Sequence, residues 1–82
     1  MGNQMSKSTI KKLNQQVNAI YEEAVNLSEK IGMTPTLEKA AISLSDLLDL
    51  NTEFNNNPSH ENYFKLAGAI IKSENILKKV YL

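Results

Sequence analysis

The 82-residue sequence contains no cysteine and no arginine, and these two absences exclude several kinds of site. Without cysteine there is no disulfide, no thiolate nucleophile and no cysteine-ligated zinc. All nine basic residues are lysine, so the bidentate contacts that arginine makes with guanine and phosphate are missing. Nine acidic residues balance the lysines to a net charge of zero. We therefore expect no nucleic-acid partner.

Long apolar runs are also absent, since none exceeds three residues. A membrane-spanning helix needs about 20 apolar residues, so we expect no integral membrane segment. Residues 1–7 are polar, without periodicity and without the apolar stretch of a secretory signal. We expect them to form a short disordered N-terminus of a cytoplasmic protein.

The titratable residues form no convincing catalytic or metal-binding pattern. His60 is the single histidine, and its sequence neighbours cannot face it on a helix, so we interpret it as a surface residue. Asp46, Asp49 and Glu53 are spaced to line one helix face. Three carboxylates can hold a hard cation, but we favour an ordinary solvated face. With three glycines in the chain there is no phosphate-binding loop. We expect no enzyme, no metal site and no cofactor.

A regular apolar pattern runs along the first third of the chain. Its members recur at alternating steps of three and four residues: Ile10, Leu13, Val17, Ile20, Ala24, Leu27 and Ile31. This spacing places them on one line along an α-helix. Such a narrow line is suited to contact with another helix, within the chain or outside it. We expect Leu13→Asp or Ile20→Asp to abolish folding or partner binding.

Periodicity and capping residues predict three helices, at about residues 9–32, 35–54 and 59–81. The first is expected to be capped by Ser6 or Ser8 and to end at Gly32 in the αL conformation. We therefore predict an all-α fold, either a three-helix bundle or an extended helical hairpin, in a single domain of residues 8–82.

The second helix is predicted to begin at Thr34-Pro35, the clearest start signal in the sequence. It has a broader apolar face than the first helix, made of Leu37, Ala40, Ala41, Leu44, Leu47, Leu48 and Phe54. This breadth suggests contact with two neighbours at once. Asn51 falls on the same face, either as a buried polar group that sets the helix register or as a sign of fraying.

The third helix is expected to start after an asparagine-rich loop, with Asn57 or Ser59 as its cap. Tyr63, Leu66, Ile70, Leu77 and Val80 lie on one line along it. Ser73 and Glu74 interrupt this face. Gly68 lies mid-helix, where glycine costs about 1 kcal/mol relative to alanine. Either a close helix crossing requires it or the fold tolerates it.

The last helix also contains a pattern found in a known family. The pattern consists of Pro58, Tyr63, Leu66, Glu74, Leu77 and Val80. Over residues 44–82 it resembles the second helix of the small helical-hairpin co-chaperones of type III secretion needles. The resemblance implies a bacterial protein that, with a second chaperone, keeps an aggregation-prone helical subunit soluble before export. The chain departs from that family in its long first helix.

We predict a small non-catalytic protein–protein interaction module that binds a partner helix as an adaptor or chaperone. An immunity or inhibitor-type bundle that neutralises a toxin or enzyme, and a self-assembling helical subunit, remain open alternatives. Residues 22–53 carry seven acids against two lysines, an acidic middle that suits a partner of mixed charge. The residues expected to bind the partner are Leu13, Val17, Ile20, Tyr21, Tyr63, Leu66, Ile70, Leu77 and Tyr81. The same apolar lines must also form the core, so the sequence does not separate the two roles.

Overall fold

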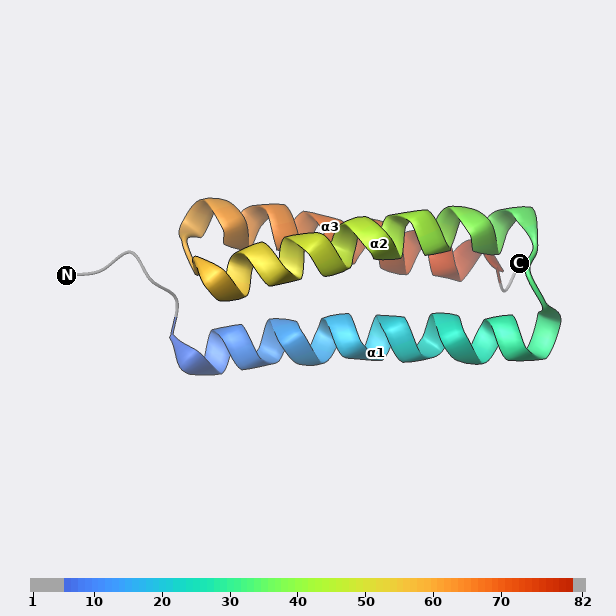
Figure 1. Cartoon of the computed structure of the whole chain (residues 1–82), viewed down its shortest axis with the longest axis horizontal. Coiled ribbons are helices and arrows are strands. Elements are labelled where there is room, and N and C mark those ends of the chain that lie inside the picture. Colours follow the sequence, from blue (N-terminus) through green and yellow to red (C-terminus); the bar gives the residue numbers. More distant parts are fainter. Residues whose placement is uncertain (1–5, 81–82) are drawn as a thin grey trace.

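A computed structural model describes residues 6–80 as three α-helices, each antiparallel to the one before it (Figure 1). They are α1 (Lys7–Ile31), α2 (Pro35–Asn56) and α3 (His60–Val80). The bundle is elongated, with extents of 48 × 19 × 17 Å. The predicted all-α three-helix bundle is confirmed. No helix in the described part of the chain is long and apolar enough to cross a membrane.

The first helix starts earlier than expected. Ser6 is its cap and accepts a hydrogen bond from the Thr9 N–H at 3.3 Å. The prediction that residues 1–7 are disordered is therefore wrong at Ser6 and Lys7, while residues 1–5 lie outside the described part. The helix ends at Ile31 because Gly32 adopts φ 73° and ψ −175°. The prediction of an αL conformation is wrong, because αL has ψ near +47°. The observed combination of φ and ψ lies in another region, one that is open essentially to glycine alone.

The second helix begins as predicted and ends later. The Thr34 hydroxyl accepts a hydrogen bond from the Leu37 N–H at 3.1 Å, and a proline follows the cap. The helix then continues to Asn56, two residues beyond the predicted end. Asn51 lies inside the helix, so the alternative prediction of fraying at that position is wrong. Its side-chain oxygen is buried and has no hydrogen-bond partner among the described residues.

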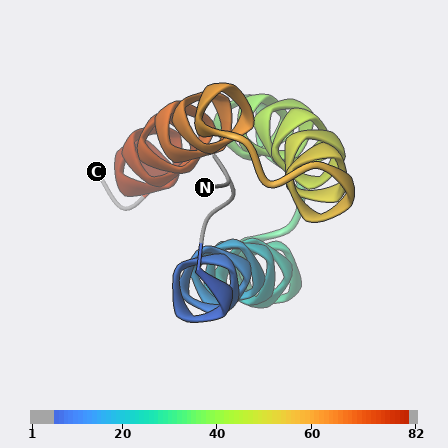
Figure 2. The same cartoon turned by 90° about the vertical axis from the view of Figure 1, so that its left-hand side faces the viewer.

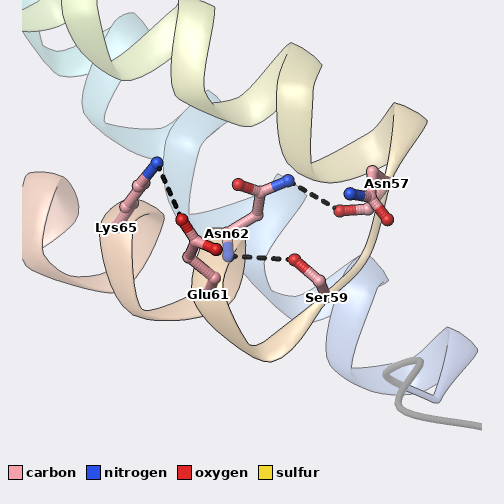
Figure 3. Close-up of polar contacts among 5 residues, drawn as sticks. All are labelled: Asn57, Ser59, Glu61, Asn62 and Lys65. Carbon is pink, nitrogen blue, oxygen red and sulfur yellow. Dashed lines mark hydrogen bonds and ion pairs between the residues drawn. The ribbon is translucent and has the colours of Figure 1, made fainter.

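The connection between α2 and α3 is held by side-chain hydrogen bonds (Figure 3). Ser59 accepts from the Asn62 N–H at 3.2 Å, which makes it the cap, rather than Asn57, of a helix that begins at His60. The Asn62 side chain donates to the Asn57 carbonyl at 2.9 Å. The predicted end of this helix at residue 81 lies outside the described part.

The helices form two layers: α2 and α3 lie side by side in one layer, and α1 runs lengthwise along them in the other (Figure 2). The core between them consists of Leu13, Val17, Ile20, Ala24, Leu27, Leu37, Ala40, Leu44, Leu47, Phe54, Leu66, Ile70 and Leu77. α2 packs against both other helices, most extensively against α3, while α1 and α3 have the least contact. The predicted double contact of α2 is confirmed. Two members of its predicted apolar face, Ala41 and Leu48, are nevertheless exposed.

Candidate partner-binding surface

Most of the residues predicted to bind a partner lie in the core. Six of them are at most 6% exposed: Leu13, Val17, Ile20, Leu66, Ile70 and Leu77. A partner cannot reach these side chains while the bundle is closed. An aspartate at Leu13 or Ile20 would place a carboxylate in the apolar core, so its expected effect is on folding.

The three aromatic members of the predicted set differ in position. Tyr63 is half-buried, and its ring centroid lies 6.3 Å from that of Phe54. Tyr81 lies outside the described part. Tyr21 is 46% exposed and is the one described member that a partner can reach freely. The surface around Tyr21 is therefore the place to look for a binding site.

An apolar groove of about 140 Å³ lies between α1 and α2, toward the end where they are connected. It is lined by Ala24, Val25, Ser28, Met33, Leu37, Ala41 and Leu44. Leu37, Leu44 and Ala24 are core residues that form its floor. Val25, Met33 and Ala41 are exposed, so the rim presents apolar side chains to solvent.

Tyr21 and Leu48 extend this groove along the two helices. Asn14 and Asn55 exchange two side-chain hydrogen bonds between α1 and α2, of 3.1 and 3.0 Å. Tyr21 follows Asn14 by seven residues and Leu48 precedes Asn55 by seven. Seven residues are nearly two helical turns, so both side chains stay at the α1–α2 boundary and lie level with each other. Leu48 is 38% exposed. We call the groove residues together with Tyr21 and Leu48 the α1–α2 strip.

Acidic residues border the α1–α2 strip on both helices. On α1, Glu29 lies one turn after Val25. On α2, Glu38 lies three residues before Ala41, which places the two on neighbouring positions of the helix surface. Both glutamates are exposed. An apolar helix flanked by basic residues would match this combination of apolar surface and negative charge.

A second groove, of about 560 Å³, lies between α1 and the last turn of α3. Its lining consists of Ala19, Glu22, Glu23, Asn26, Leu27, Lys30, Ile31 and Val80. Charged side chains of both signs make it more polar than the α1–α2 strip. It is therefore less suited to an apolar helix.

Two buried serines form a contact that the sequence analysis missed. The hydroxyl oxygens of Ser43 on α2 and Ser73 on α3 are 2.9 Å apart, and the residues are 7% and 2% exposed. Each serine occupies a position that the helical period assigns to the core: Ser73 lies three residues after Ile70, and Ser43 three residues after Ala40. This placement in the helical period indicates that both serines are buried. It does not indicate which residue of the other helix each serine contacts.

The residues considered for catalysis or metal binding lie on the surface. His60 is exposed at the start of α3, and Asp46, Asp49 and Glu53 are exposed on α2. The described part of the chain contains no group of three or more histidine, cysteine or carboxylate side chains arranged to hold a metal ion. The three acids contribute negative charge to the surface of the bundle.

No family of known proteins, no curated protein and no solved structure matches this chain. The resemblance to the needle co-chaperones therefore stays a prediction.

Proposed function

We propose that the chain is a non-catalytic adaptor or chaperone that binds an amphipathic helix of a partner protein along the α1–α2 strip. The observation that carries this proposal is the level pairing of exposed Tyr21 and exposed Leu48, continued by the apolar groove beside them. A helix laid between two antiparallel helices would bury these side chains as a fourth helix does in a bundle.

The dimensions and charges of the α1–α2 strip define the partner. From Tyr21 to Ser28 the strip runs about 10 Å along α1, and Met33 extends it beyond the helix. This length accommodates two or three apolar side chains at positions i, i+4 and i+7 of a partner helix. Lysine or arginine beside that apolar line would face Glu29 and Glu38.

The proposal also includes the cellular location of the protein and the kind of subunit that it binds. The protein would act in the cytoplasm of a bacterium, as the resemblance to the needle co-chaperones implies. The bound helix would belong to a subunit that aggregates when its apolar face is uncovered. Binding in the α1–α2 strip would cover that face without opening the core.

A pull-down with the tagged full chain from the source cells tests the proposal. We expect one stoichiometric partner, identified by mass spectrometry and sized by light scattering. The double variant Tyr21→Glu/Leu48→Glu should lose this partner, since it places two carboxylates in an apolar contact beside acidic residues. Ile42→Glu is the matched control, because Ile42 is 68% exposed on α2 outside the strip and its replacement should leave the partner bound.

Circular dichroism of each variant checks that the helices are retained, which we expect for substitutions at exposed positions. Capture of no partner by the natural chain would contradict the proposal. Equal capture by the double variant and the natural chain would place the binding site elsewhere.

A further inference from the structure

Small side chains create the apolar groove of the α1–α2 strip. Ser28 follows Asn14 by fourteen residues on α1, and Ala41 precedes Asn55 by fourteen residues on α2. Because Asn14 and Asn55 are hydrogen-bonded to each other and the two helices are antiparallel, Ser28 and Ala41 lie level with each other across the boundary. Ala24, one turn before Ser28, is also small. These side chains leave a hollow that larger residues would fill.

The lining of this groove suits an apolar side chain. Among the described lining residues, Ser28 alone has a polar side chain, and its hydroxyl already donates to the Val25 carbonyl at 2.8 Å. The floor includes Leu37 and Leu44, which are 2% and 9% exposed. A polar group of a partner would therefore lose its water without gaining a free side-chain donor, which costs free energy.

The volume of the groove matches one aromatic ring. An apolar cavity of about 150 Å³ binds benzene, and this groove has about 140 Å³. Met33, which is 59% exposed, borders the groove at the end where α1 and α2 are connected. Methionine sulfur makes favourable contacts with aromatic rings. A phenylalanine side chain therefore fits both the size and the lining.

Two exposed glutamates flank the groove, one on each helix. Glu29 lies about 40° farther from the core side of α1 than Val25, and Glu38 lies about 60° farther from the core side of α2 than Ala41. The groove therefore lies between the two carboxylates.

The two glutamates also lie at nearly the same height. Glu29 follows Asn14 by fifteen residues, and Glu38 precedes Asn55 by seventeen. Counted from the hydrogen-bonded amide pair, the offset is two residues, or about 3 Å along the axis. Glu38 is the one nearer to the connected end.

We propose that this groove holds one phenylalanine side chain of the partner helix, and that lysine or arginine stands directly before and directly after that phenylalanine. The inference rests on the proposed function and names the chemistry that the α1–α2 strip recognises. When the phenylalanine points into the groove, the residues before and after it point about 100° to either side. A basic residue on each side then faces one glutamate.

The heights of these two basic residues match those of the glutamates. Residues before and after the phenylalanine are about 3 Å apart along the partner helix, as Glu29 and Glu38 are. Because the helix is right-handed, the one on the α2 side is nearer to the connected end for either direction of the partner helix. Glu38 has the same displacement relative to Glu29, so both pairs can form together.

Synthetic peptides test the phenylalanine site on the full natural chain. The probe is a capped alanine-based helix of about 15 residues with a central Lys-Phe-Lys, and methyl chemical shifts of the protein follow its binding. We expect saturable shifts at Val25, Met33 and Leu44. A peptide with Lys-Ala-Lys should bind more weakly, on the order of 10-fold or more, because it lacks the buried ring. Equal binding of the two peptides, or no saturable shift, would overturn the inference.

Filling the groove should block the Lys-Phe-Lys peptide. Ala41→Leu places a larger side chain at the rim of the groove and should weaken binding on the order of 10-fold or more. Ala19→Leu, at an exposed position of α1 outside the strip, is the matched control and should bind as the natural chain does. Circular dichroism checks that both variants keep their helices. Equal affinity of the two variants would contradict a site in this groove.

Charge exchange tests the flanking residues. The natural chain should bind the Lys-Phe-Lys peptide on the order of 5-fold more tightly than a Glu-Phe-Glu peptide, with a difference that decreases as salt is added. In the double variant Glu29→Lys/Glu38→Lys this preference should reverse. An unchanged preference would show that these glutamates do not face the partner and would overturn the inference.

The pull-down from the source cells separates this inference from the proposed function. Loss of the natural partner by Ala41→Leu supports both. If Tyr21→Glu/Leu48→Glu loses the partner while Ala41→Leu captures it fully, the phenylalanine site is overturned and the proposed function stands. If the peptides bind in the groove as expected but the natural chain captures no partner, the phenylalanine site is supported and the proposed function fails.

Discussion

The α2–α3 pair and α1 are held in the bundle by different kinds of contact. Between α2 and α3 there are a fully buried phenylalanine, a buried serine pair and a turn closed by side-chain hydrogen bonds. α1 contributes one narrow apolar line and the exposed amide pair of Asn14 and Asn55. Grooves lie along both of its sides. The comparison shows that the width of a helix's apolar face determines how firmly the helix is held. The broad apolar face of α2 packs extensively against its neighbours, whereas α1 packs through a single narrow apolar line.

Phe54→Ala should produce the largest loss of stability among the substitutions that test this comparison. Phe54 is 0% exposed and contacts Tyr63, and removing such a ring costs about 3–5 kcal/mol. Leu13→Ala, near the same end of the bundle on α1, should cost less, about 2 kcal/mol, because its edge of the core can collapse more easily. Urea unfolding followed by circular dichroism measures both. An equal or larger loss for Leu13→Ala would break the comparison.

The serine pair should show strong coupling between α2 and α3. Ser43→Ala or Ser73→Ala alone leaves one buried hydroxyl without its partner, at a cost of about 1–3 kcal/mol. The double variant removes both hydroxyls and should be closer to the natural chain in stability than the sum of the single losses predicts. A double-mutant cycle in urea measures this coupling. Strictly additive losses would mean that the hydrogen bond does not link the helices energetically.

Hydrogen exchange should reveal the weaker attachment of α1 directly. We expect central amides of α1 to exchange through openings that need less free energy than those of α2 and α3, by on the order of 1 kcal/mol. Native-state exchange followed by NMR gives the opening free energy of each amide. Uniform protection of all three helices would show that the bundle opens as one unit.

Gly68→Ala should have the smallest effect, and in the opposite direction. Because the position is open and helical, alanine should stabilise the chain by about 0.5–1 kcal/mol. The measurement is urea unfolding at a protein concentration low enough to exclude self-association. Gly32→Ala is the contrasting control, since its φ of 73° is strained for alanine and should make that variant less stable.

The sequence predicted those features that depend on nearby residues. The three helices, the Thr34 cap and the double contact of α2 follow from periodicity and capping, which act within one or two turns. The Ser43–Ser73 pair and the level pairing of Tyr21 with Leu48 depend on how two helices are aligned. No local pattern contains that alignment. For the same reason, Ile20 and its neighbour Tyr21 both belonged to the predicted surface, although the fold buries one and exposes the other.

The connection between α1 and α2 has a consequence for competition. Just three residues, from Gly32 to Thr34, join these helices. If α1 detaches from α2 and α3, a connection this short keeps it near its packing position at an effective concentration in the range of about millimolar. A helix of another protein that competes for this position must therefore bind it more tightly than the tethered α1 does. Such a tether protects the core from exchange with helical segments of other proteins.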